Sequence, residues 1–137
     1  MIARLTRGAY CRFETSLAAD ANAAMAITAT HLSAAAAGLT WAGIEWVRFG
    51  KPSLMGAVTG LIGGLATVTP ASGFVGPLGG LILGALAGFI CFFAVQIVKQ
   101  RLKIDDSLDV FAVHGVGGIL GSLGVAILAS ADFGGVG

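Results

Sequence analysis

Four long apolar stretches, separated by short polar breaks, dominate the pattern of the chain. The stretches cover residues 18–47, 53–68, 74–98 and 108–131. A helix needs about 20 apolar residues to cross the hydrocarbon core of a bilayer. The breaks RFGKPS, TPASG and KQRLKIDDS contain the charged, glycine and proline residues that end helices. The pattern therefore predicts an all-α, polytopic membrane helix bundle with four transmembrane helices.

The composition favours the same class. Of the 137 residues, 56% are hydrophobic and 11% are charged, whereas a soluble domain has about 25% charged residues. The net charge of +1 gives no reason to expect nucleic acid, so we expect the lipid bilayer as the surroundings. Two cysteines make no disulfide framework, and Cys91 is expected to be buried. The sequence offers no phosphate-binding loop, no closely spaced metal ligands and no nucleophile beside a base, so we expect no enzyme, metal site or cofactor.

The basic residues predict the orientation. With four crossings, the first and third breaks lie on one side, and the positive-inside rule makes that side cytoplasmic. These breaks hold Arg48, Lys51, Lys99, Arg101 and Lys103. The segment 1–15 is a basic leader on the predicted outer side, and it lacks the apolar run of a signal peptide. We therefore treat residues 1–15 as foreign to the rest of the chain.

Glycines recur at a spacing of four in two of the predicted helices. Such spacing places them on one helical stripe, and small stripes let helix backbones approach closely in lipid. The residues are Gly56, Gly60 and Gly64 in the second stretch and Gly76, Gly80, Gly84 and Gly88 in the third. We interpret both sets as packing surfaces rather than as sites of chemistry.

The fourth stretch is different because it carries an ionisable ring. Asp109 falls in the predicted first turn, where a carboxylate suits the helix dipole. His114 lies about 9 Å along the axis from Leu108, inside the apolar zone, and intramembrane ionisable residues indicate function by default. The glycines beside it, Gly115, Gly117, Gly118 and Gly121, predict a narrow space next to the ring. The alternative is a histidine that only bonds a neighbouring carbonyl group.

The segment DDSLDVFAVHGVGGILGSL closely resembles the pore-helix signature of the ammonium transporter family, which includes methylammonium permeases and Rhesus glycoproteins. The segment GLTWAGIEWVRFGKPSLMGAVTGLIGGLATVTPASGFVGPLGGLILG is similar to the helices that precede it. The resemblance covers residues 16–137. It implies an inverted-repeat fold of eleven helices, of which this chain holds the seventh to the tenth, and a homotrimer with one pore per subunit in the cell (plasma or inner) membrane.

The resemblance also implies roles for individual residues. His114 matches the second of two pore histidines, Asp109 the acid at the cytoplasmic end of that helix, and Thr69 the threonine in the loop after the eighth helix. Thr15 or Ser16 keeps a hydroxyl near the external ammonium site, although YCRFETS lacks the family pattern there. Phe111, one turn before His114, faces the pore or packs.

The implied function is transport of ammonium or ammonia through a pore with a histidine relay. Helices one to six and eleven are missing from the match, so we expect a fragment that does not conduct alone. A second hypothesis is an electron-transfer bundle in which His31 and His114 bind haem axially, although we favour a core or interface position for His31. A third is an inert membrane packing module.

Overall fold

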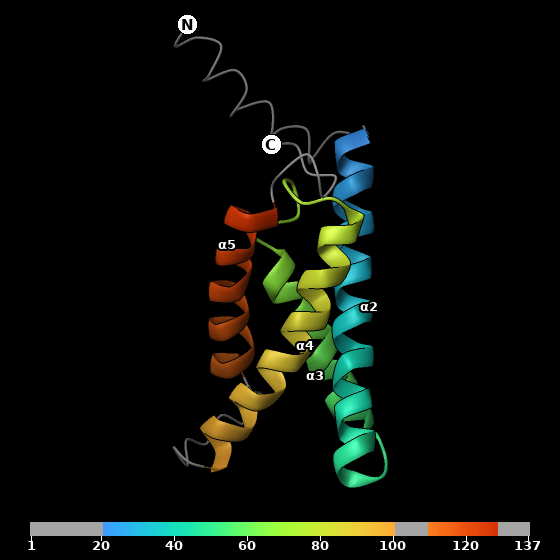
Figure 1. Ribbon diagram of the computed structural model, residues 1–137, viewed down its shortest axis with the longest axis vertical. Helices are drawn as coiled ribbons and strands as arrows, with labels where there is room; N and C mark the ends of the chain where they lie inside the picture. Colours follow the sequence, from blue (N-terminus) through green and yellow to red (C-terminus); the bar gives the residue numbers. More distant parts are fainter. Residues whose placement is uncertain (1–20, 101–109, 129–137) are drawn as a thin grey trace, which may run out of the picture.

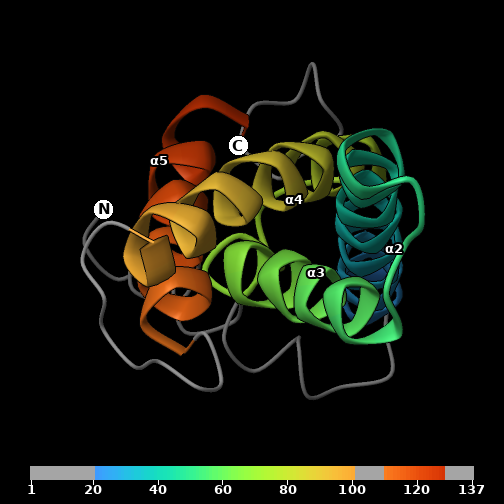
Figure 2. The same ribbon diagram turned by 90° about the horizontal axis from the view of Figure 1, so that it is seen from below.

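The computed structural model describes residues 21–100 and 110–128, and this part of the chain forms a helical bundle without strands (Figure 1). The prediction of an all-α fold is therefore confirmed for these residues. The elements are α2 (Ala21–Phe49), α3 (Leu54–Val68), α4 (Pro77–Gln100), the π-helical turn η1 (Phe111–Gly115) and α5 (Val116–Leu128). Helices α3 and α4 lie between α2 on one side and α5 on the other (Figure 2).

Within the described ranges, two helices are long and apolar enough to cross a membrane. They span residues 23–49 and 77–100, while 54–68 and 111–127 are shorter apolar helices. At 1.5 Å per residue, the 15 residues of α3 extend about 22 Å, less than the roughly 30 Å of a bilayer core. Pro70 follows directly after its C-cap residue Thr69, and a proline cannot continue the hydrogen bonds of a helix.

The helix ends differ from the predicted ones by a few residues, for local reasons. Helix α2 continues past residue 47 to Phe49 and ends at Gly50, whose φ of 74° is the left-handed conformation that suits a helix end. Helix α4 begins at Pro77 rather than at residue 74. The N–H groups of Phe74 and Val75 both donate to the carbonyl of Ala71, so these residues form a turn. Residues 18–20, 108–109 and 129–131 of the predicted helices lie outside the described ranges.

The turn between α2 and α3 is held by one acidic side chain. Glu45 accepts hydrogen bonds from the Trp41 indole at 3.2 Å and from the Ser53 backbone N–H at 2.7 Å. The Ser53 hydroxyl also lies 3.0 and 3.1 Å from the two Glu45 oxygens, and it accepts from the Gly56 N–H at 2.9 Å as the N-cap of α3. The carboxylate thus satisfies donors at the start of α3 that the helix itself leaves unpaired.

Both predicted glycine stripes pack on α2, from Gly56 to Gly64 and from Gly80 to Gly88, and the interpretation is confirmed for these parts. A Cβ atom on Gly80 would lie 2.7 Å from the Ala29 carbonyl oxygen, and one on Gly88 would lie 2.5 Å from that of Ala37. A Cβ atom on Gly84 would overlap the Ser33 carbonyl oxygen, and one on Gly64 would lie 2.6 Å from the same atom. Helices α3 and α4 therefore contact α2 backbone to backbone, at places where no larger side chain fits.

We predict that Gly84→Ala destabilises the bundle while Gly43→Ala does not. The added methyl group at residue 84 overlaps the backbone of α2, and overpacking of this kind costs about 1–3 kcal/mol of unfolding free energy. A Cβ atom on Gly43 meets nothing within 4 Å, so this matched change is neutral or slightly stabilising through helix propensity. Denaturant unfolding in detergent micelles, followed by far-UV circular dichroism, measures both. Equal loss of stability in the two variants would contradict the packing argument.

Candidate functional site

The inner face of η1 and α5 packs against α3 and α4. Ala112 and Val113 are buried, and the Cys91 thiol of α4 lies 3.9 Å from the Val113 carbonyl oxygen. Further along, a Cβ atom on Gly117 would lie 3.0 Å from the Thr67 hydroxyl, and one on Gly121 would overlap the Thr67 carbonyl. Cys91 is fully buried, as predicted. These contacts fix which face of the helix points outward.

His114 lies on the outward face and is exposed. It belongs to η1, a single π-helical turn within an otherwise α-helical segment. Such turns insert one extra residue into a helix and occur frequently at functional sites. Within this turn, Val113 is buried in the bundle, whereas the adjacent His114 is exposed.

The face of the helix beside His114 has little side-chain bulk. A Cβ atom on Gly118 would meet nothing within 4 Å, and one on Gly115 would meet only the Phe111 ring, at 3.9 Å. The exposed Ser122 hydroxyl donates to the Gly118 carbonyl at 2.9 Å. His114, Gly118 and Ser122 are spaced four apart, so they follow one line along the helix. We call these three residues the His114 face.

The four glycines near His114 therefore divide into two pairs. Gly117 and Gly121 serve close packing against α3, and only Gly115 and Gly118 leave space near the ring. The prediction of space next to the ring is therefore wrong for Gly117 and Gly121, and Ser122 is a residue of this face that was not predicted. The spacing His-x-x-x-Gly-x-x-x-Ser was the available signal for that residue.

The other predicted site residues are not all brought to His114. Phe111 is 65% exposed and starts the same π-helical turn. Thr69 is exposed at the far end of α3, where its hydroxyl donates to the Leu65 carbonyl at 2.7 Å. Gly63 lies at the level of Val113, and six further residues of helix place Thr69 about 9 Å beyond it. Asp109, Thr15 and Ser16 lie outside the described ranges.

His31 lies away from His114. It is exposed on α2, with its Nδ1 atom 3.1 Å from the Ile27 carbonyl oxygen, so it is not a core residue of this chain. Helices α3 and α4 lie between α2, which carries His31, and the η1–α5 segment, which carries His114 (Figure 2). This geometry opposes the haem hypothesis, which needs both rings on one iron.

Comparison with known proteins identifies the family. The model of the Ammonium Transporter Family matches residues 13–135. The ammonium transporter Amt1 of Archaeoglobus fulgidus is 45% identical over 121 residues, which are 88% of this chain and 30% of that protein. The ammonium transporter of Aquifex aeolicus is 39% identical over the same length and is covered to 29%. The chain thus spans about a third or less of the length of these relatives.

Solved structures agree with the sequence match. The crystal structure of Saccharomyces cerevisiae Mep2 superposes with a TM-score of 0.77 at 40% identity, over 84% of this chain and 27% of that one. A structure titled sensor Amt protein gives a TM-score of 0.79 at 31% identity, over 85% and 29%. The chain belongs to the Ammonium Transporter Family, and the predicted membrane helix bundle is confirmed. The match begins at residue 13, so it includes Thr15 and Ser16.

We predict that the two turns flanking α3 lie on opposite sides of the membrane. Lys51 precedes α3 and Ser72 follows it, so the two residues lie at opposite ends of the bundle (Figure 1). In a chain with Cys11→Ser and Cys91→Ala, a membrane-impermeant maleimide applied to intact cells should label Ser72→Cys and not Lys51→Cys. Lysis should expose Lys51→Cys as well. Labelling of both positions from outside would rule out a membrane-spanning α3.

Proposed function

We propose that this chain forms one wall of a path for ammonium or ammonia across the plasma or inner membrane, with His114 on that wall. The observation that carries the proposal is the position of the imidazole. It is exposed on an apolar helix whose opposite face is packed against α3 and α4. Membership of the Ammonium Transporter Family supplies the substrate class.

Imidazole chemistry suits this task. Ammonium is a small cation, and stripping its water in an apolar pore costs far more than moving neutral ammonia. A neutral imidazole has one donor and one acceptor nitrogen, so it replaces part of the lost hydration and can pass a proton near neutral pH. The low bulk at Gly118 leaves room for a small solute beside the ring, and the Ser122 hydroxyl oxygen offers a further acceptor.

The wall needs a partner surface. An imidazole that is open to hydrocarbon is unfavourable, and irregular polar paths in membranes are enclosed by protein. His114 is open on its outward side, so further protein must cover it before the path conducts. We infer that the rest of a longer parent protein, assembled as a homotrimer, supplies this cover, and that the 137 residues alone do not conduct.

The remaining residues take secondary roles in this proposal. Phe111 borders the same face one turn before His114, and the family resemblance assigns Asp109 a role at the cytoplasmic mouth of the path. Thr69 acts at the external end, at a distance from the ring, and Thr15 or Ser16 contributes a hydroxyl on that side. The domain in this view comprises residues 16–137, and the family match extends it by three residues, to residue 13.

Growth on low ammonium tests the proposal. In cells lacking ammonium uptake, the chain alone should not restore growth, whereas co-expression with a chain carrying the first six helices of a relative should. Within that pair, His114→Ala should lower methylammonium uptake by about tenfold or more, because a hydrogen-bonding group that faces a cation in the path is lost. His31→Ala is the matched control and should leave uptake nearly unchanged.

Three outcomes would contradict the proposal. Robust uptake by the chain alone would show that no further wall is needed. If uptake required His31 rather than His114, the assignment of the path to the His114 face would be wrong. If the pair assembles but never transports, the chain acts as an inert packing module, which was the third hypothesis from the sequence.

Chemical accessibility gives an independent prediction. In the co-expressed pair, with Cys11→Ser and Cys91→Ala, a small water-soluble thiol reagent should modify His114→Cys much faster than Val113→Cys. Val113 is buried against Cys91 and Gly63, so its rate of modification measures the accessibility of the inner face of the same turn. Equal rates, measured by mass spectrometry after timed quenching, would mean that His114 faces no aqueous path.

A further inference from the structure

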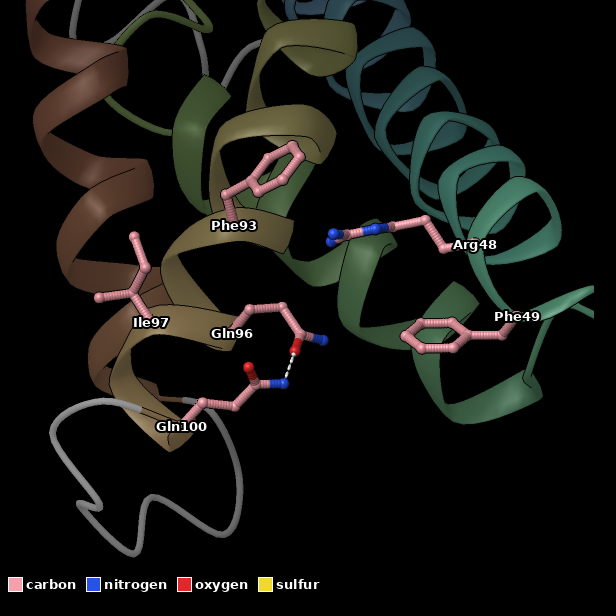
Figure 3. A pocket seen from close by; sticks show the side chains of 6 residues that line it. All are labelled: Arg48, Phe49, Phe93, Gln96, Ile97 and Gln100. Carbon is pink, nitrogen blue, oxygen red and sulfur yellow. Dashed lines mark hydrogen bonds between the residues drawn. The ribbon is translucent and has the colours of Figure 1, made fainter.

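A pocket between α2 and α4 does not include the helix that carries His114. It opens at the ends of α2 and α4 and has a volume of about 470 Å³. Its lining residues are Arg48, Phe49, Phe93, Gln96, Ile97 and Gln100 (Figure 3). None of these residues belongs to η1 or α5. The position of the imidazole depends instead on how η1 and α5 pack against α3 and α4.

Thr67 is a buried polar residue at the interface with α5. It lies in the last turn of α3 and is fully buried. Its hydroxyl donates to the Gly63 carbonyl oxygen, one turn earlier, at 2.8 Å. A hydroxyl has one donor hydrogen and two acceptor lone pairs. This bond uses the hydrogen and leaves the oxygen available for contacts with the neighbouring helix.

Thr67 contacts α5 at two levels. A Cβ atom on Gly117 would lie 3.0 Å from the Thr67 hydroxyl oxygen, and one on Gly121 would overlap the Thr67 carbonyl oxygen. Because Gly117 and Gly121 are about one turn apart, a single residue of α3 sets the distance between α3 and α5 over that turn. Gly117 follows His114 by three residues, about 4.5 Å along the helix axis. A displacement of the helix at Gly117 therefore moves the imidazole as well.

The atom at the contact with Gly117 is an oxygen, and its type matters for the distance. A Cα–H group approaches an oxygen to a carbon–oxygen distance of about 3.3–3.6 Å, whereas two carbon atoms pack at about 3.5–4.0 Å. A methyl group in place of the hydroxyl would therefore push α5 away from α3 by roughly a few tenths of an ångström. Since His114 lies on the outward face, this displacement would move its ring further outward.

We propose that Thr67 is a positioning residue for the path beside His114. Its hydroxyl lets α5 lie close to α3, and this closeness sets how much room a solute has beside the imidazole. The inference rests on the proposed function, because it requires His114 on the wall of the path. Methylammonium is larger than ammonium by one methyl group, so it is the solute that detects a narrower path. Residue 67 therefore controls the selectivity between the two cations.

The ratio of methylammonium uptake to ammonium uptake tests the proposal, in the pair co-expressed with the first six helices of a relative. Thr67→Val keeps the shape of the side chain and places a methyl group against Gly117. It should lower the ratio about threefold, a part of the roughly tenfold that one methylene group is worth in a closely fitting site. Thr67→Ser keeps the hydroxyl and removes only the methyl group, so it is the matched control and should leave the ratio nearly unchanged. A purely structural defect would lower both uptakes in proportion.

A further variant keeps the test decisive if Thr67→Val does not assemble, which size-exclusion chromatography of the pair would reveal. Thr67→Ala removes the hydroxyl without adding a methyl group in its place, so α5 can approach α3 and the ratio should rise. The proposal would be overturned by an unchanged ratio in the assembled variants, or by equal changes in Thr67→Val and Thr67→Ser.

His114→Ala separates the failure of this inference from the failure of the proposed function. If uptake depends on His114 while the ratio does not respond to residue 67, only the positioning role of Thr67 is wrong. If uptake does not depend on His114, or if the pair never transports, the proposed function is wrong and the positioning role falls with it.

Discussion

The backbone contact of α2 with α3 and α4 is the constraint on which the rest of the structure depends. A single carbonyl group, that of Ser33, lies under both Gly64 and Gly84, and the buried Ser33 hydroxyl donates to the Gly64 carbonyl at 3.0 Å. Lipid tails are as apolar as the side chains, so the hydrophobic effect does not drive helices together within a membrane. The helices associate largely through close packing and hydrogen bonds of this kind. With α3 and α4 fixed in this way, Gly63 and Cys91 form the surface that receives Val113 and orients η1.

The sequence predicted the packing better than the helix ends. Glycine spacing is a local property that survives in any helix, so Gly60, Gly64, Gly80, Gly84 and Gly88 could be assigned to an interface before their partner was known. The start of α4 at Pro77 depended instead on the bonds of the preceding turn to Ala71. The role of Glu45 at the N-cap of α3 could not be predicted from residue spacing. It depends on the turn between α2 and α3, which brings Ser53 next to Glu45.

The candidate site was predictable in part for the same reason. The depth of His114 in an apolar helix follows from counting residues, and the family resemblance added its role. Its outward direction depends on the packing of Val113 and Gly117 against α3 and α4, which the sequence does not show. The separation of Thr69 and of His31 from His114 depends on how the described helices are arranged in space. The pocket lined by Arg48, Phe93 and Gln100 could not be predicted, because its residues come from positions about 50 apart in the sequence.

The π-helical turn also gives this segment a freedom that the rest of α5 lacks. Gly117 and Gly121 hold the upper helix against Thr67, so a change in length there would break two tight contacts at once. A one-residue deletion within Phe111–Gly115 would restore α-helical hydrogen bonding. The residues of this turn before the deletion would then be rotated about the helix axis by about 100° relative to α5. The gain or loss of one residue at this turn therefore changes which side chain faces outward and leaves the interface above it intact. The side chain on the outward face of this turn can therefore be exchanged while the contacts of α5 with Thr67 are kept.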